Sequence, residues 1–155
     1  MSDKILLLIS NIKRDLIAIE TIYQELETHP FGQEASKDTL IIIAYHLHNL
    51  YNAFENIFLN IARTFENSID DKTQWHAELL ERMTLSINLL RPAVIDETAY
   101  DALDELRRFR HLFRHAYMVK LDPMRLQLVI HKANQLRTIY PNQVELFLSF
   151  LNRLE

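Results

Sequence analysis

Hydrophobic residues recur at alternating spacings of three and four along most of this chain, a pattern typical of amphipathic helices. One such stripe covers residues 5–26, and a second covers residues 40–65. A further apolar line runs beside the second stripe, so we expect that helix to be buried over a wide face and to be central. Between the two helices, residues 28–36 contain Pro30 and Gly32 and predict a loop.

Further helices are predicted in the second half of the chain. The polar residues 67–72 predict a loop, and a third helix is expected over residues 73–90. It should end at Arg91, because the proline that follows disfavours helical backbone in the residue before it. Asp96 is a favourable N-cap, so a fourth helix is predicted to run from there to about Tyr117.

The last helix is predicted to begin at Asp122-Pro123, with aspartate as its N-cap and proline in its first turn. Pro141 is expected to kink or break it, and residues 144–154 should continue as helix. The chain has neither an internal repeat nor an inter-domain linker, so residues 1–155 are expected to form a single domain. The predicted fold class is all-α, an antiparallel up-and-down bundle of four to six helices.

Composition agrees with this fold and excludes several functions. The 155 residues are 48% hydrophobic, enough for one packed core, and a single glycine leaves little room for the turns of a sheet protein. The absence of cysteine excludes disulfides, thiolate nucleophiles and cysteine metal sites. The apolar run at residues 5–9 is too short for a membrane span, so we expect a cytoplasmic protein without membrane association. A net charge of -4 gives no overall attraction to nucleic acid.

One segment departs from this acidic background. Between residues 107 and 125 stand six lysines and arginines and two histidines against a single acid. At about 100° per residue, the basic side chains of a helix here should share one arc, opposite an apolar face. The expected arc comprises Arg107, Arg108, Arg110, His111, Arg114 and His115. No acid after Asp104 and Glu105 stands at helical spacing to neutralise it, so phosphate is the expected counter-charge, and a solvated basic face is the alternative.

Neither a metal nor a cofactor is predicted. His111 and His115 are four residues apart and could chelate a cation, but no carboxylate accompanies them and neighbouring arginines would repel the ion. The chain also lacks a glycine-rich phosphate loop and a G-x-S-x-G motif. We expect His46 to be a hydrogen-bonded histidine beside the core. Three further histidines are expected to be surface or capping residues: His29, His76 and His131.

The segment 110–117, Arg-His-Leu-Phe-Arg-His-Ala-Tyr, resembles the R-x(4–6)-H motif of HEPN ribonucleases. It more closely resembles the R-x-x-x-x-H-x-Y form of HepT-like toxins from HEPN/MNT toxin–antitoxin pairs. Residues 44–55 are similar to the second helix of that family, and residues 68–80 resemble it as well. Any arginine-rich helix can produce R-x(4)-H, but R-H-x-x-R-H-x-Y at the end of the fourth helix of a small bundle is much more specific.

The resemblance implies a HEPN-like bundle and a metal-independent endoribonuclease that works as a homodimer, with two motifs facing each other across a cleft. Arg110 and His115 would be its catalytic residues. A neutral His115 can take the proton of the RNA 2′-hydroxyl, and Arg110 can stabilise the charge that grows on the phosphate. His111 would be auxiliary, as leaving-group acid or phosphate contact, and Arg107 and Arg114 would bind flanking RNA phosphates.

The resemblance also implies a partner, an MNT-type nucleotidyltransferase antitoxin that attaches AMP to Tyr117 and silences the enzyme. Packing at the helix end is the simpler role for this tyrosine, and the two roles are compatible. The alternative function is a non-catalytic helical subunit that binds a nucleotidyltransferase and uses the basic face to hold nucleotide or protein.

Overall fold

The structure of this chain is a computed structural model that describes residues 2–32, 34–66, 75–115 and 121–154, with Ser2 and His115 described by their backbone only. Five α-helices make up most of these residues, and no strand occurs among them. The all-α fold class is therefore confirmed. The helices are α1 (Ser2–Glu27), α2 (Lys37–Phe65), α3 (Trp75–Arg82), α4 (Glu97–His115) and α5 (Pro123–Arg153).

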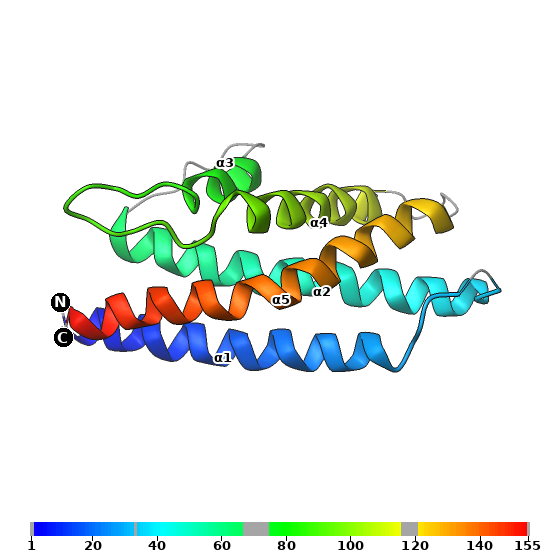
Figure 1. Cartoon of the computed structure of the whole chain (residues 1–155), viewed down its shortest axis with the longest axis horizontal. Coiled ribbons are helices and arrows are strands. Elements are labelled where there is room, and N and C mark those ends of the chain that lie inside the picture. The colour runs from blue at the N-terminus through cyan, green and yellow to red at the C-terminus, as the bar shows by residue number, and fades with distance from the viewer. Residues whose placement is uncertain (1, 33, 67–74, 116–120, 155) are drawn as a thin grey trace.

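The four long helices run alternately in opposite directions, as predicted for an up-and-down bundle (Figure 1). The helix α1 leads away from the N-terminus, α2 returns, α4 leads away again and α5 returns, so that both termini lie at one end of the bundle (Figure 1). The short α3 packs on α2 and α4. None of these described helices is long and apolar enough to cross a membrane.

The second helix is central, as its two apolar lines predict. It contacts each of the other four helices, and it is buried along most of its length. Tyr51, Phe54 and Phe58 are almost completely inaccessible. The Phe54 ring meets the ring of Tyr140 on α5 edge to face at 5.1 Å, a favourable aromatic geometry. The core of the bundle thus forms around α2.

The two predicted aspartate caps are confirmed. The Oδ1 atom of Asp96 accepts a hydrogen bond from the backbone N–H of Ala99 at 2.9 Å, and this bond holds the pKa of Asp96 below its usual value. The Oδ1 atom of Asp122 accepts from the N–H of Met124 at 3.0 Å. These caps fix the first turns of α4 and α5.

The third helix ends much earlier than predicted. It stops at Arg82, and the side chain of Arg91 is fully buried in the segment that follows. The Arg91 guanidinium donates to the carbonyl oxygens of Arg82, Leu85 and Pro92 and forms an ion pair with Glu66 at 2.7 Å. The prediction of helix up to residue 90 was wrong, because this guanidinium satisfies carbonyls that a longer helix would have paired internally.

The last helix was expected to be kinked or broken at Pro141, and no break occurs. It runs from Pro123 to Arg153 through the proline. Tyr140 and Val144 are buried on either side of it, and this packing compensates for the backbone hydrogen bond that proline removes. The predicted loop at residues 67–72 and the predicted end of the fourth helix near Tyr117 lie outside the described residues.

Candidate functional site

Arg110 lies inside the bundle and not on an exposed basic arc, so the predicted position of its side chain was wrong. Only 8% of the residue is exposed. Its Nη1 atom donates to Oδ1 of Asn52 at 2.8 Å and lies 3.5 Å from Oε1 of Glu55. Its Nη2 atom lies 3.1 Å from Nδ1 of His76, and the guanidinium carbon sits 5.3 Å from the centre of the Tyr51 ring. Residues of α2 and α3 thus enclose the guanidinium, and we call these five residues the Arg110 cluster.

The burial of Arg110 follows from its helical position. It stands four residues after Leu106 and seven after Leu103, both fully buried on the face that α4 turns to the core. The sequence predicted an apolar face on this helix, but Arg110 was assigned to the opposite arc because of its charge. The spacing itself therefore contained the signal that would have placed the arginine in the core.

Glu55 balances the charge of Arg110 and orients His76. The carboxylate is 7% exposed, and one of its oxygens lies 2.8 Å from Nδ1 of His76. Because a carboxylate only accepts hydrogen bonds, we assign the Nδ1 proton of His76 to this bond. Nδ1 then does not accept from Arg110, and the 3.1 Å approach of Nη2 is a contact and not a hydrogen bond. His76 was expected at the surface or at a cap; it is partly exposed in the first turn of α3, and its ring also contacts Glu55 and Arg110. The feature of the sequence that could have indicated a polar partner here is Glu55, an acid within the apolar stripe of α2.

His48 extends the cluster along α2. The Asn52 amide uses its oxygen for Arg110, so its Nδ2 group faces Nε2 of His48, 3.2 Å away. This hydrogen bond requires an unprotonated Nε2. Burial lowers the pKa of His48, and the nearby charges of Arg110 and Arg114 lower it further, which agrees with a neutral imidazole. A chain of polar contacts therefore leads from His48 through Asn52 to Arg110.

The lowered pKa of His48 predicts a loss of stability in mild acid. The unfolded chain takes up the His48 proton near its ordinary pKa of about 6.5, whereas the folded chain resists it. As the pH falls below about 6.5, the free energy of unfolding should therefore decrease. Urea unfolding at pH 7.5 and pH 5.5 measures the decrease, and His48→Gln, which still accepts from Asn52, should reduce it. An equal decrease in both proteins would contradict the assignment.

Two other arginines of the predicted basic arc form ion pairs within α4. Arg107 and Arg108 both form ion pairs with Asp104, at 2.9 and 2.7 Å. No acid was expected after Asp104 and Glu105, and the acid that neutralises these two arginines is Asp104 itself, whose carboxylate reaches both. His111 and Arg114 are exposed on the surface of α4.

The two remaining predicted residues are the last described residue of α4 and a residue that follows it in the sequence. His115 is the last residue of the helix, and its side chain is outside the described part of the structure. Tyr117 also lies outside the described residues. On an ideal helix, residues 110 and 115 are rotated by about 140° relative to each other.

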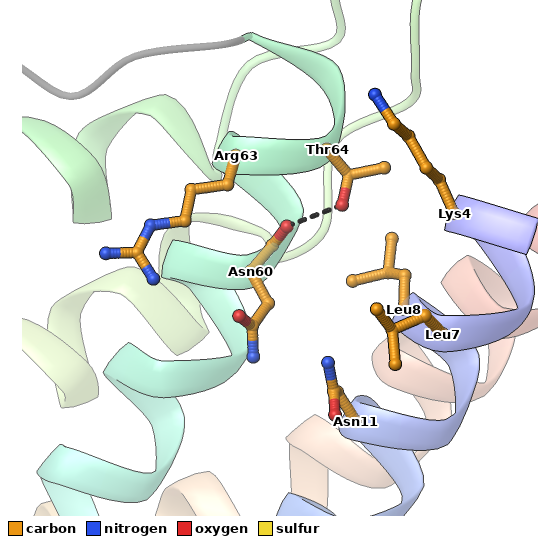
Figure 2. A pocket seen from close by; sticks show the side chains of 7 residues that line it. All are labelled: Lys4, Leu7, Leu8, Asn11, Asn60, Arg63 and Thr64. Carbon is orange, nitrogen blue, oxygen red and sulfur yellow. Dashed lines mark hydrogen bonds between the residues drawn. The ribbon is translucent and has the colours of Figure 1, made fainter. Parts of the chain in front are cut away.

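A separate shallow pocket of about 220 Å³ lies between the first turns of α1 and the last turns of α2 (Figure 2). Thr64 donates a hydrogen bond to the backbone carbonyl of Asn60 within it, at 2.8 Å. None of its lining residues belongs to the Arg110 cluster, so the pocket is not part of the candidate site. It is lined by Lys4, Leu7, Leu8, Asn11, Asn60, Arg63 and Thr64.

The fold and the site define a class of protein: a small helical bundle in which the arginine of an R-x(4)-H motif on the fourth helix is buried against a carboxylate and contacts a histidine. The sequence model of the HepT-like protein family matches residues 42–151, from the early turns of α2 to the end of α5. The chain therefore belongs to the HepT-like family, of the HEPN toxin type, as the resemblance in residues 110–117 suggested. Neither the curated proteins nor the solved structures contain a match to the chain.

Proposed function

We propose that this protein is the toxin of a toxin–antitoxin pair and a metal-independent endoribonuclease that uses Arg110 and His115 at a homodimer cleft. The observation that supports it is the buried Arg110 cluster on the helix that ends in His115. Burying a guanidinium and a carboxylate costs desolvation energy, and an apolar core at these positions is often at least as stable. Buried charges that cost stability are often kept for function.

The chemistry needs only groups that RNA and this chain supply. The 2′-oxygen attacks the adjacent phosphorus while His115 accepts its proton, and the bond to the 5′-oxygen breaks. The leaving oxygen takes a proton from an acid, for which His111 is the candidate. Arg110 stabilises the charge on the phosphate oxygens through the 9% of its side chain that remains exposed. The products carry a 2′,3′-cyclic phosphate and a 5′-hydroxyl.

A second copy of the chain would complete the site. Arg110 and His115 diverge around the helix, so one copy does not present both groups side by side. A two-fold axis near the end of α4 would bring the two motifs together and create a cleft for one scissile phosphate. Arg114, exposed on α4, would bind a flanking phosphate. Arg107 would do the same after exchanging its Asp104 partner for the phosphate.

Cleavage of RNA by the purified protein in EDTA tests the proposal. We expect wild-type protein to cut total RNA without divalent metal and to leave 2′,3′-cyclic phosphate ends, because neither nucleophile nor base requires a cation. An identical preparation of His115→Ala is the control for contaminating ribonucleases. Equal cleavage by both preparations would contradict the assignment of His115, and a strict metal requirement would contradict the mechanism.

Regulation at Tyr117 is the second part of the proposal. An AMP group two residues from His115 would bring bulk and negative charge to the arginines that bind RNA. With the nucleotidyltransferase antitoxin and ATP, mass spectrometry should find the AMP adduct at Tyr117, and cleavage should stop. Tyr117→Phe should remain active and unmodified under the same conditions. An adduct at another residue would exclude this mode of control, and inhibition without ATP would indicate occlusion by the partner.

The high burial of Arg110 favours a second candidate function, a non-catalytic subunit for a nucleotidyltransferase. An arginine whose donors already face Asn52, Glu55 and His76 can be structural. Expression of this chain alone in a bacterial host separates the two functions. An endoribonuclease toxin should arrest growth, whereas a binding subunit should have no effect without its enzyme.

A further inference from the structure

Three side chains of metal-ligand type meet where α1 leads into α2. Glu25 lies in the last turn of α1, His29 follows the end of that helix, and His46 lies in the third turn of α2. One ligand atom from each lies within 4.8 Å of the other two. The imidazole rings of His29 and His46 stack with their centres 6.1 Å apart and their planes at 23°. The sequence predicted none of this, because His46 comes from a different helix.

The local backbone brings the first two ligands onto one side. The N–H groups of Thr28 and His29 donate to the carbonyl oxygens of Glu25 and Leu26, at 3.1 and 3.2 Å. The chain therefore keeps turning past the end of α1. Glu25 and His29 remain neighbours at four-residue spacing, as on a helix.

The site is separate from the Arg110 cluster. His46 and His48 are two residues apart on α2 and therefore project from different faces of that helix. His46 stacks on His29, next to α1, whereas the ring of His48 lies 5.6 Å from that of Phe113 on α4. The two groups of histidines thus occupy different interfaces of the bundle.

The donor set favours zinc over the hard cations. Two imidazoles and one carboxylate suit Zn²⁺, whereas Ca²⁺ and Mg²⁺ take mainly oxygen ligands. Tetrahedral zinc with bonds of 2.0–2.2 Å would need its ligand atoms about 3.4 Å apart, a contraction that side-chain rotation can supply. Glu25 is exposed and both histidines are partly exposed, so their side chains have room to rotate.

The charge near the site does not oppose a cation. Within the described residues, no lysine or arginine forms an ion pair with Glu25. Arg137, which contacts the same end of α1, pairs with Glu20 and Glu27. The carboxylate that would neutralise part of the metal charge is therefore not taken by an arginine.

We propose that Glu25, His29 and His46 bind one Zn²⁺ ion that clamps the end of α1 to α2. The ion closes the segment between His29 and His46, which includes most of the loop predicted for residues 28–36. Its fourth coordination position is left to water at the surface. Two of the three ligands precede residue 42, where the match to the HepT-like family begins. The role of the ion is to stabilise the fold, and RNA cleavage does not depend on it.

The experiment uses full-length, tag-free protein that has been dialysed against EDTA and then returned to chelator-free buffer. Calorimetric titration with ZnCl₂ should give one site per chain with micromolar or tighter affinity. Saturating zinc should raise Tm by about 5 °C or more, because the ion binds the folded chain preferentially. The same concentrations of MgCl₂ should leave Tm unchanged. RNA cleavage in EDTA is measured in parallel, so that failure of the zinc site and failure of the proposed ribonuclease are distinguishable.

Matched variants identify the ligands. His29→Gln and His46→Gln should each weaken zinc binding by at least about tenfold, since even outer contacts of metal ligands contribute that much. His131→Gln, which removes an exposed histidine on α5, should bind zinc like the wild type. Unchanged zinc affinity in both ligand variants would overturn the proposal. So would the absence of binding by the wild type at a ZnCl₂ concentration of about 10⁻⁴ M, which is well above the dissociation constants of structural zinc sites.

Discussion

Arg110→Ala is expected to lower the rate of RNA cleavage by about a thousandfold, the upper range for loss of one preorganised donor to a developing negative charge. The guanidinium donates to Asn52 and pairs with the Glu55 carboxylate, so its orientation is fixed before RNA binds. Alanine removes the positive charge and also leaves the Glu55 carboxylate without its ion pair. Single-turnover cleavage of an end-labelled RNA measures the change in rate, because it separates the chemical step from product release.

Arg110→Lys separates charge from geometry. Lysine restores a positive charge in the same place, but a compact ammonium cannot contact Asn52 and phosphate with the fixed, planar set of donors that arginine offers. We expect this variant to recover little of the lost activity. Arg91→Lys is the matched control, since Arg91 is an equally buried arginine that pairs with Glu66 instead. It should lower stability while leaving the cleavage rate of the folded protein nearly unchanged.

Two results would contradict the role of Arg110. Full activity of the lysine variant would reduce the residue to a generic charge, and full activity of the folded alanine variant would remove it from the mechanism. Circular dichroism and urea unfolding establish that each variant is folded under the assay conditions. The non-catalytic function described above predicts the absence of cleavage in the wild type as well.

The long helices could be predicted from the sequence because their signals are local. Alternating spacings defined α1 and α2, and the aspartates at positions 96 and 122 marked the starts of α4 and α5. Each of these signals acts within one turn of helix, where the contacts depend on sequence distance alone. The early end of α3 was missed because it depends on the ion pair between Arg91 and Glu66, which are 25 positions apart.

The candidate site likewise combines a local signal, which the sequence shows, with distant partners, which it does not. The motif in residues 110–117 was visible in the sequence, but the partners of Arg110 come from two other helices. Asn52 and His76 are 58 and 34 positions away from it, so no spacing rule connects them. A charged residue was assigned to solvent because unpaired charges are seldom buried. That rule fails where a second charge, here Glu55, lies buried beside the first.

Glu55 is the residue on which the arrangement of the cluster depends. It is the acid that contacts both Arg110 and His76, at 3.5 and 2.8 Å. It therefore holds the guanidinium in place and selects the proton position on the imidazole. Because Glu55 is buried among these partners, we assign it a positioning role: it acts on the reaction through Arg110 and does not itself contact RNA.

Glu55→Gln is expected to lower kcat by about a hundredfold while changing KM by less than about threefold. A misplaced Arg110 should stabilise the transition state less well, whereas it should affect the binding of the RNA polyanion much less. The free energy of unfolding should also fall, by about 2–3 kcal/mol, because Arg110 loses its buried counter-charge. Glu66→Gln is the matched control. It breaks the ion pair of another buried arginine, Arg91, and should reduce stability to a similar extent while kcat is retained. Equal losses of kcat in both variants would mean that Glu55 contributes only to folding, whereas a selective loss in Glu55→Gln would identify the buried carboxylate as the residue that orients Arg110 for the reaction.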